Sequence, residues 1–233
     1  MLFSAHVVDT APLTAIRRKT PQSSDVGGLK SARTATCGPM TRTTLPRPQL
    51  GREAMLACWE DEHALDRFLA DHPTGQEFAE GWHVRMELVR AAGVWPGIED
   101  DMVAEAGNKV TDMTGPSVAI TIGTAYLRSA VAFTKVNNGL EEQFLDTATG
   151  RWGTLMSNLP QRLVATLTIW DSADSAFDYV KTGAHGAAVA KHYDPAKDPT
   201  GHTFVTGGGF FGFRPLSTSG SVGGKNPLPA DLL

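Results

Sequence analysis

The histidines are the residues of this chain best suited to chemistry, because an imidazole can carry a proton or bind a metal near neutral pH. There are seven in 233 residues. His185 stands out, since it lies in the stretch Gly183-Ala184-His185-Gly186-Ala187-Ala188-Val189. The small residues on both sides would let a large, flat group approach the backbone. This pattern makes His185 a candidate ligand of a metal or a porphyrin, and an ordinary structural histidine is the alternative.

No familiar catalytic motif accompanies this histidine. The chain contains no GxSxG nucleophile turn, no HExxH zinc motif and no Gly-rich phosphate loop. Cys37 and Cys58 show neither CxxC nor Cys/His zinc spacing, and both fall in strand-like stretches where a small buried apolar role is common. Gly207-Gly208-Gly209 also lies in a strand-like stretch and indicates a bulge or a close approach. The phenylalanines beside it could belong to the core or to a pocket wall: Phe210, Phe211 and Phe213.

Composition and charge exclude several classes of protein. Hydrophobic residues make up 41% and charged residues 20%, which is typical of a folded globular chain rather than a disordered one. The formal net charge of -4 argues against a nucleic-acid binder. No apolar run approaches the ~18 residues of a membrane span, and the first residues lack the charged start of a secretory signal. We therefore expect a cytoplasmic protein.

A repeat predicts the elements that must position His185. Trp59 and Trp170, 111 residues apart, each end an apolar run. Acidic or hydroxyl residues that suit a helix N-terminus follow each of them, and apolar residues at i, i+3 and i+4 come next. Further strands are predicted on both sides of each unit. The predicted strands are 2–8, 29–37, 54–59, 84–89, 118–125, 152–157, 163–170 and 203–213, with helices near 11–19, 64–69, 126–137 and 173–180.

Each half therefore has the order strand, helix, strand, strand, helix, strand (βαββαβ). This order favours an antiparallel sheet with both helices on one face, the ferredoxin-like arrangement. Because the other face of such a sheet is bare, we expect an α+β protein in which two fused ferredoxin-like halves close face to face. A coincidental order without duplication is the alternative. The predicted boundaries are 1–91 for the first half, 92–116 for a linker outside the sheets, 117–216 for the second half and 217–233 for an extended C-terminal tail.

Several short motifs resemble the spheroidene monooxygenase family in their order and approximate spacing, from Leu2 to about Leu228. The resemblance implies a dimeric-α/β-barrel-type fold within one chain. It also implies haem (heme b) as cofactor and the oxygenation of an apolar carotenoid with O2 and electrons from reduced ferredoxin. The motifs are Ala57-Cys58-Trp59, Gly115-Pro116-Ser117-Val118-Ala119, Leu167-Thr168-Ile169-Trp170-Asp171, the His185 stretch, Arg47-Pro48 and Gly224-Lys225-Asn226-Pro227-Leu228.

The resemblance also suggests roles for individual residues. It implies that His185 is the proximal ligand of the haem iron, with Gly186 beside it in the cofactor site. A guanidinium group suits a carboxylate, so three arginines are candidates to pair with the haem propionates, with solvated surface charge as the alternative for each: Arg128, Arg151 and Arg162. For the alternative haem reactions named below, the discriminating feature would be a distal His or Ser that faces the iron, and the candidates are His6 and Ser157.

The sequence also departs from the family. Residues 121–136 carry only Arg128 and Lys135 as basic residues, and residues 153–157 are more polar than the family pattern, so the substrate need not be a carotenoid. We expect a haem-dependent monooxygenase of an apolar small molecule. One alternative is a different haem reaction, either aldoxime dehydration or haem degradation. Another is a barrel that binds haem or an apolar ligand without catalysis. Nothing in the sequence indicates the oligomeric state.

Overall fold

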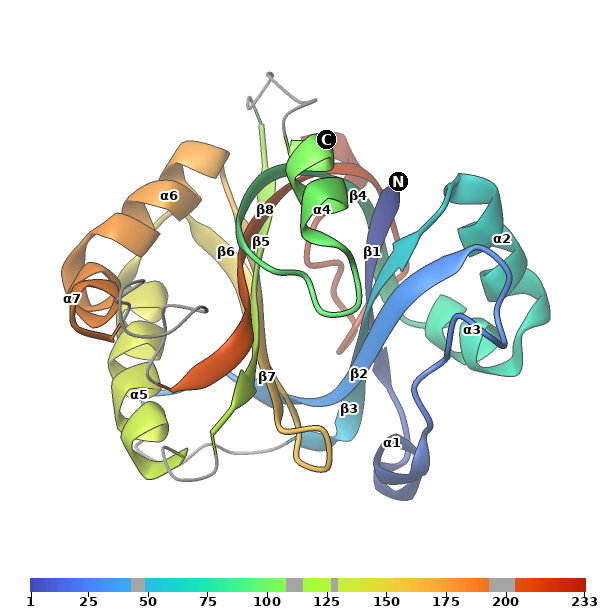
Figure 1. The fold of residues 1–233 in the computed structure, drawn as a ribbon, viewed down its shortest axis with the longest axis horizontal. Helices are drawn as coiled ribbons and strands as arrows, with labels where there is room; N and C mark the ends of the chain where they lie inside the picture. The colour runs from blue at the N-terminus through green and yellow to red at the C-terminus, as the bar shows by residue number, and fades with distance from the viewer. Residues whose placement is uncertain (43–48, 108–114, 127–129, 193–203) are drawn as a thin grey trace.

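Eight antiparallel strands form a closed barrel, and most of the helices pack against its outer face (Figure 1). The computed structural model describes residues 1–42, 49–107, 115–126, 130–192 and 204–233. Around the barrel, the strand order is β1-β3-β2-β6-β7-β5-β8-β4. The protein is therefore an α+β barrel. The strands are β1 (Leu2–Asp9), β2 (Leu29–Pro39), β3 (Gln49–Trp59), β4 (Trp82–Gly93), β5 (Ser117–Ala125), β6 (Gly150–Asn158), β7 (Leu163–Trp170) and β8 (Val205–Ser219).

Two groups of helices lie on opposite sides of the barrel, and α4 lies between them in the view of Figure 1. One group covers the strands of the first half, and α5 to α7 cover those of the second half. Within the described residues, no helix is long and apolar enough to cross a bilayer. The helices are α1 (Pro12–Arg17), α2 (Glu62–Asp71), α3 (Pro73–Ala79), α4 (Asp100–Gly107), α5 (Ala130–Asp146), α6 (Ala173–Lys181), α7 (Gly183–His192) and a short 3-10 helix, η2 (Ala230–Leu232).

The predicted units around Trp59 and Trp170 are both present. Trp59 ends β3, and the Asp61 side chain accepts the N–H of Ala64 at 2.8 Å to cap α2. Trp170 ends β7, and the Ser172 hydroxyl accepts the N–H of Ser175 at 3.1 Å to cap α6. Strand order is equivalent too, β4-β1-β3-β2 in the first half and β8-β5-β7-β6 in the second. The sequence pattern thus located both strand-to-helix junctions.

The described part of the predicted linker covers the barrel core, where a course across the outside of the sheets was expected. Trp95 is buried in the barrel core, with ring centroids 5.1 Å from Phe3 and 5.1 Å from Phe211. Ile98 and Val103 join the same core cluster. The physical reason is that the open end of a barrel would leave its inner apolar side chains in water, and the apolar residues of this segment cover them.

The last residues also contact the core. β8 continues past the predicted boundary at 216, because its last residues pair with β4 through His83 and Ser219. Beyond it, Val222 pairs with Lys225 in an isolated bridge, and Val222 and Leu228 are buried in the barrel cluster. The stretch predicted as an extended tail therefore contributes to the core.

Gly208 and Gly209 mark a close approach of neighbouring strands, as their position in a strand predicted. Gly208 has φ +96°, and a Cβ there would lie 1.9 Å from the carbonyl oxygen of Ile122. At Gly209 a Cβ would lie 2.1 Å from the carbonyl oxygen of Ala92. The register between β5 and β8 shifts beside these glycines, which is the signature of a bulge.

Candidate functional site

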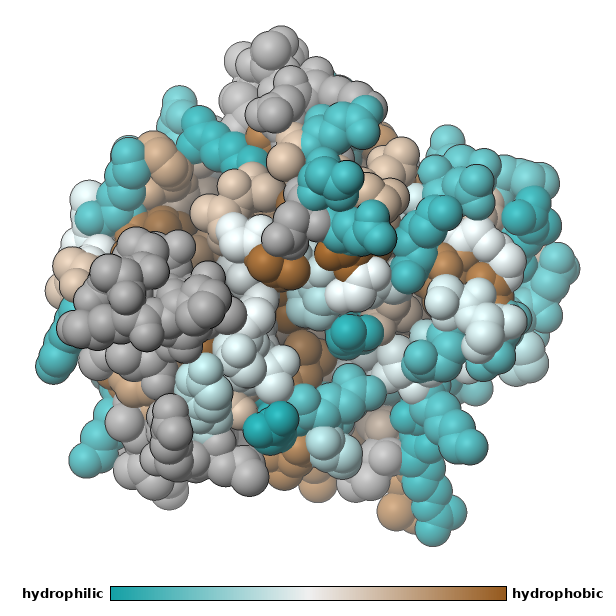
Figure 2. Space-filling model, in the orientation of Figure 1, coloured by the Kyte–Doolittle hydropathy of each residue, from teal (hydrophilic) through white to brown (hydrophobic). Residues whose placement is uncertain are grey.

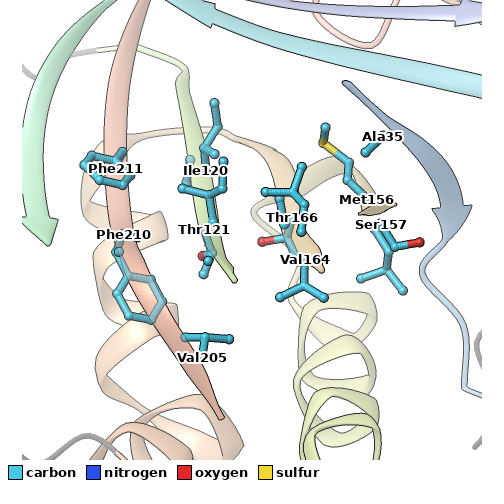
Figure 3. Close-up of a pocket in the computed structure, with 18 of the residues that line it drawn as sticks. Ala35, Ile120, Thr121, Met156, Ser157, Val164, Thr166, Val205, Phe210 and Phe211 are labelled. Atoms are coloured by element: carbon cyan, nitrogen blue, oxygen red, sulfur yellow. The ribbon is translucent and has the colours of Figure 1, made fainter. Parts of the chain in front are cut away.

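A cavity of about 1770 Å³ lies against the second-half strands and helices α5 to α7, and extends to residues of α1 and β2. It exceeds the roughly 300–1,000 Å³ of common small-molecule sites. In Figure 3, Phe210 and Val205 of β8, Thr121 of β5, and Val164 and Thr166 of β7 line it. The side chains on this wall are mostly apolar or small, so the cavity can hold a large apolar molecule.

Small residues in the second half contribute to the cavity at positions where the first half has large ones. In the first half, Met55 of β3 and Leu65 of α2 are fully buried and fill the layer between sheet and helices. The residues 111 positions later are Thr166 of β7 and Ala176 of α6, and both line the cavity. The same fold thus has one filled and one hollow layer.

His185 lies in the first turn of α7 and lines this cavity. Its side chain is buried, with 6% of the residue exposed. Nδ1 lies 3.0 Å from the carbonyl oxygen of Val180. A carbonyl can only accept, so Nδ1 carries the proton and Nε2 keeps its lone pair. Burial lowers the pKa of His185, which keeps the imidazole neutral and able to bind a metal.

Gln143 of α5 holds the backbone around His185. Its Oε1 accepts the N–H of His185 at 2.8 Å. Its Nε2 donates to the carbonyl oxygens of Tyr179 at 3.3 Å and Thr182 at 3.2 Å. Gly183, with φ +57°, leaves room for this amide, because a Cβ there would lie 2.8 Å from Oε1. Sequence reasoning missed Gln143, because a glutamine in a helix carries no signal of a contact about 40 residues away.

Aromatic rings surround the imidazole. The ring centroids of Tyr179 and Phe210 lie 5.1 Å and 5.4 Å from that of His185. Behind Tyr179, Trp170 is at 4.9 Å and contacts Phe144 at 5.2 Å. The Tyr179 hydroxyl donates to the carbonyl oxygen of Leu140 at 2.7 Å, which ties α6 to α5. These contacts restrict the ring to one orientation.

The other predicted cofactor residues have different surroundings. Gly186 does not line the cavity. A Cβ there would lie 2.2 Å from the carbonyl oxygen of Lys181, so this glycine lets α7 pack against the end of α6. Arg162 lines the cavity from the turn between β6 and β7, where it is exposed with φ +54°. Arg151 forms an ion pair with Asp171 and does not line the cavity. Arg128 lies outside the described residues.

The two residues named for a distal role lie apart. Ser157 of β6 lines the cavity. His6 of β1 does not, because it is buried in the filled layer of the first half. There its ring stacks on that of His83, with centroids 5.5 Å apart, and its Nε2 lies 2.9 Å from the Ser4 hydroxyl. Burial lowers the pKa of His6 well below its ordinary value.

A polar group borders the cavity near α1. Arg18 and Glu53 line it, and both side chains are almost fully buried. Arg18 Nε donates to Glu53 at 2.6 Å, and its Nη2 donates to Glu77 at 2.5 Å. Burial raises the pKa of Glu53 to about 7, since the loss of hydration outweighs the attraction of Arg18.

The two cysteines take no part in this site as thiolates. Both are free and buried, as predicted, and burial raises the pKa of each thiol to about 12. Within the parts of the chain that the structure describes, no cluster of three or more His, Cys, Asp or Glu side chains could hold a metal ion. His185 is therefore the candidate metal ligand at the cavity.

Comparison with known proteins gives one informative match. No family model matches the chain. The chain is similar to a spheroidene monooxygenase. That protein, from Rubrivivax gelatinosus, is 27% identical over 184 residues, which cover 77% of this chain and 66% of the relative. The match thus spans just under two thirds of the relative's length.

Solved structures with a similar arrangement are more distant. An aldoxime dehydratase in complex with butyraldoxime has 7% identity and a TM-score of 0.43, with 92% of this chain and 78% of that chain covered. A chlorite dismutase from Candidatus Nitrospira defluvii has 10% identity and a TM-score of 0.30, with 92% and 90% covered. Similarity at this level carries no information about function, and the fold description rests on the strand pairing itself.

Proposed function

We propose that this protein is a haem-dependent monooxygenase that oxygenates an apolar small molecule in the cavity, using O2 and an external electron donor such as reduced ferredoxin. The observation that carries the proposal is His185, a buried imidazole that lines a large apolar cavity and whose Nδ1 is hydrogen-bonded to a backbone carbonyl, so that Nε2 keeps its lone pair. The name of the relative from Rubrivivax gelatinosus supports the reaction type. A carotenoid is one candidate substrate.

The cavity residues fit a haem b group. A porphyrin supplies four nitrogen ligands, so its iron needs one protein ligand, which His185 can provide through Nε2. The small residues Ala119, Thr121 and Gly123 on β5 leave space against the sheet. Arg162 at the cavity edge is the described candidate to pair with a propionate, and Arg128, outside the described residues, is the second proposed partner. When bound, haem supplies the binding and activation of dioxygen.

The residues of the chain have distinct tasks in this proposal. The Val180 carbonyl accepts the Nδ1 proton of His185, which makes Nε2 a stronger electron donor. Gln143 fixes the backbone that carries the ring. Apolar walls such as Phe210 and Val164 bind an apolar substrate and exclude water from the reacting atoms.

We also propose that the barrel consists of two ferredoxin-like halves, 1–91 and 117–216, joined by 92–116. The equivalent strand orders of the two halves support this division. Neither half could cover its own sheet, because the inner faces of both sheets meet in one core cluster. The hollow layer of the second half would then be a specialisation of one copy.

The test is to supply haem, a chemical or ferredoxin reductant and 18O2, and to analyse products from a carotenoid and from other apolar candidates by mass spectrometry. The proposal predicts a product that contains one 18O atom, and only when haem and reductant are both present. Conversion of an aldoxime without O2 would contradict this proposal and indicate an aldoxime dehydratase. Breakdown of the haem itself would indicate a haem-degrading enzyme. Haem binding without turnover of any candidate would favour a binding barrel.

A further inference from the structure

Three strongly exposed leucines lie at one edge of the barrel. Leu159, in the turn between β6 and β7, is 84% exposed, Leu13 of α1 is 63% exposed and Leu50 of β3 is 47% exposed. Isolated exposed leucines are common, but a group of them beside a cavity indicates an interaction site. Leu50 and Leu159 also line the cavity, so the cavity reaches this edge.

Hydrogen bonds join the three segments that carry these leucines. The N–H of Thr10, just before α1, donates to the carbonyl oxygen of Gly51 in β3 at 2.8 Å. Gln161, in the turn between β6 and β7, donates through Nε2 to the Thr20 hydroxyl after α1 at 3.3 Å. In Figure 1, α1 and this turn lie together along the lower edge of the molecule. The leucines therefore belong to one surface.

Basic residues surround the same surface. Arg17, Lys19 and Arg162 are exposed, and none of them forms an ion pair within the described residues. Of the nearby acids, Asp9 is paired with Arg52 at 2.7 Å and the half-exposed Glu77 with Arg18 at 2.5 Å, while Asp25 is exposed. Figure 2 shows hydrophobic and hydrophilic side chains side by side along this lower edge. A chain with net charge -4 thus has a cationic, apolar edge.

We propose that this surface, which we call the leucine edge (Leu13, Leu50 and Leu159 with Arg17, Lys19 and Arg162), docks on an anionic phospholipid bilayer. Leucine side chains enter the boundary between headgroups and acyl chains, while basic residues beside them bind lipid phosphates. Docking there would place the cavity entrance on the bilayer. An apolar substrate could then enter the cavity without crossing water. The docking itself requires neither haem nor the proposed reaction.

The experiment is vesicle flotation of the full chain with phosphatidylcholine alone or mixed with phosphatidylglycerol, at low and high salt. We expect flotation with the anionic vesicles, weakened by salt because screening reduces attraction between exposed charges. The double variant Leu13→Ser/Leu159→Ser should lose binding by at least about tenfold, since both apolar and electrostatic contributions are needed for stable attachment. The charge reversal Arg17→Glu/Lys19→Glu should also lose it.

A matched control replaces two leucines elsewhere, Leu216→Ser/Leu233→Ser, which are 48% and 45% exposed. This variant should float like the unmodified protein, and circular dichroism should show that all variants remain folded. Failure of the unmodified protein to float would overturn the proposal, as would an equal loss in the control variant. A change of oligomeric state in the Leu13/Leu159 variant, with flotation unchanged, would instead identify the edge as a contact with another copy or a partner protein.

Discussion

The side-chain Oε1 of Gln143 accepts the backbone N–H of His185 at 2.8 Å, while its Nε2 donates to two carbonyl oxygens of the preceding turn. One amide on α5 thus fixes both the end of α6 and the start of α7. The imidazole is fixed separately, by its own hydrogen bond to Val180. A histidine held at backbone and ring keeps Nε2 in one place, which a metal ligand requires.

Replacing the Gln143 side-chain amide should make the backbone at His185 more mobile. We expect Gln143→Leu to lower the free energy of unfolding by about 1–3 kcal/mol, because the His185 N–H loses its acceptor and two hydrogen bonds to backbone carbonyl groups are lost. Because a released backbone would let the ring move away from the Val180 carbonyl, the nitrogen NMR shifts of the His185 ring should also show a mixture of tautomers in the protein without cofactor.

Gln76→Leu is the matched control. Gln76 donates to the carbonyl oxygen of Ala70 at 2.7 Å in the filled half, so its loss should leave the His185 signals unchanged. Gln143→Glu keeps the acceptor for His185 and should preserve the tautomer better than leucine does. If the His185 spectrum of Gln143→Leu matched that of the unmodified protein, the positioning role would be refuted.

A larger side chain in the layer between the second-half sheet and its helices should raise the free energy of unfolding and weaken ligand binding. Thr166→Met introduces the side chain that the first half has at Met55, and should raise the free energy of unfolding by about 1 kcal/mol through added apolar burial. It should also reduce the uptake of haem or an apolar dye at least tenfold. Thermal denaturation and ligand titration measure the two effects.

The reciprocal variant Met55→Thr tests the comparison of the two halves. It leaves a gap in a filled layer and should lower the free energy of unfolding by about 2–5 kcal/mol, while ligand uptake stays the same. Unchanged ligand uptake in Thr166→Met would mean that molecules bind elsewhere.

Glu53 should make stability depend on pH. Its pKa is about 7 in the folded protein and 4.5 in the unfolded chain, so the folded state holds the proton more tightly. The free energy of unfolding contributed by this group therefore falls as pH rises from 4.5 to 7. Glu53→Gln stays neutral and should be more stable than the unmodified protein at pH 8, by on the order of 2 kcal/mol, with little difference at pH 4.5.

Chemical denaturation of both proteins across this range measures the difference. The buried histidines His6 and His83 have the opposite effect, because their lowered pKa values make the free energy of unfolding rise with pH up to 6.5. Both proteins contain these histidines, so their contribution cancels when the two free energies of unfolding are subtracted. A difference that did not change with pH would show that Glu53 is ionised throughout.

Much of the fold could be predicted from the sequence, because local patterns encode it. Alternating apolar residues and the residues after Trp59 and Trp170 located strands and helix starts within a few positions. The place of Trp95 could not be found this way, since an apolar residue between two elements does not reveal which surface it covers. The barrel closure that buries it depends on contacts between distant segments.

The site was only partly predictable for the same reason. His185 lines the cavity, but the glycines beside it make room for other parts of the chain: Gly183 for the Gln143 amide and Gly186 for the Lys181 backbone. Thr166 and Ala176 are ordinary residues in their own strand and helix. That they line a cavity, while Met55 and Leu65 at the equivalent positions are buried in a packed cluster, is seen only in the structure.

The measurement that tests the account most directly is a haem titration followed by the near-ultraviolet (Soret) absorbance band. The unmodified protein should saturate with one haem per chain, and His185→Ala should bind at least about tenfold more weakly with a shifted band. His63→Ala, at an exposed position, should titrate like the unmodified protein. Added imidazole should restore the original band in His185→Gly. A folded His185→Ala variant with unchanged affinity and spectrum would contradict the assignment of His185 as the iron ligand.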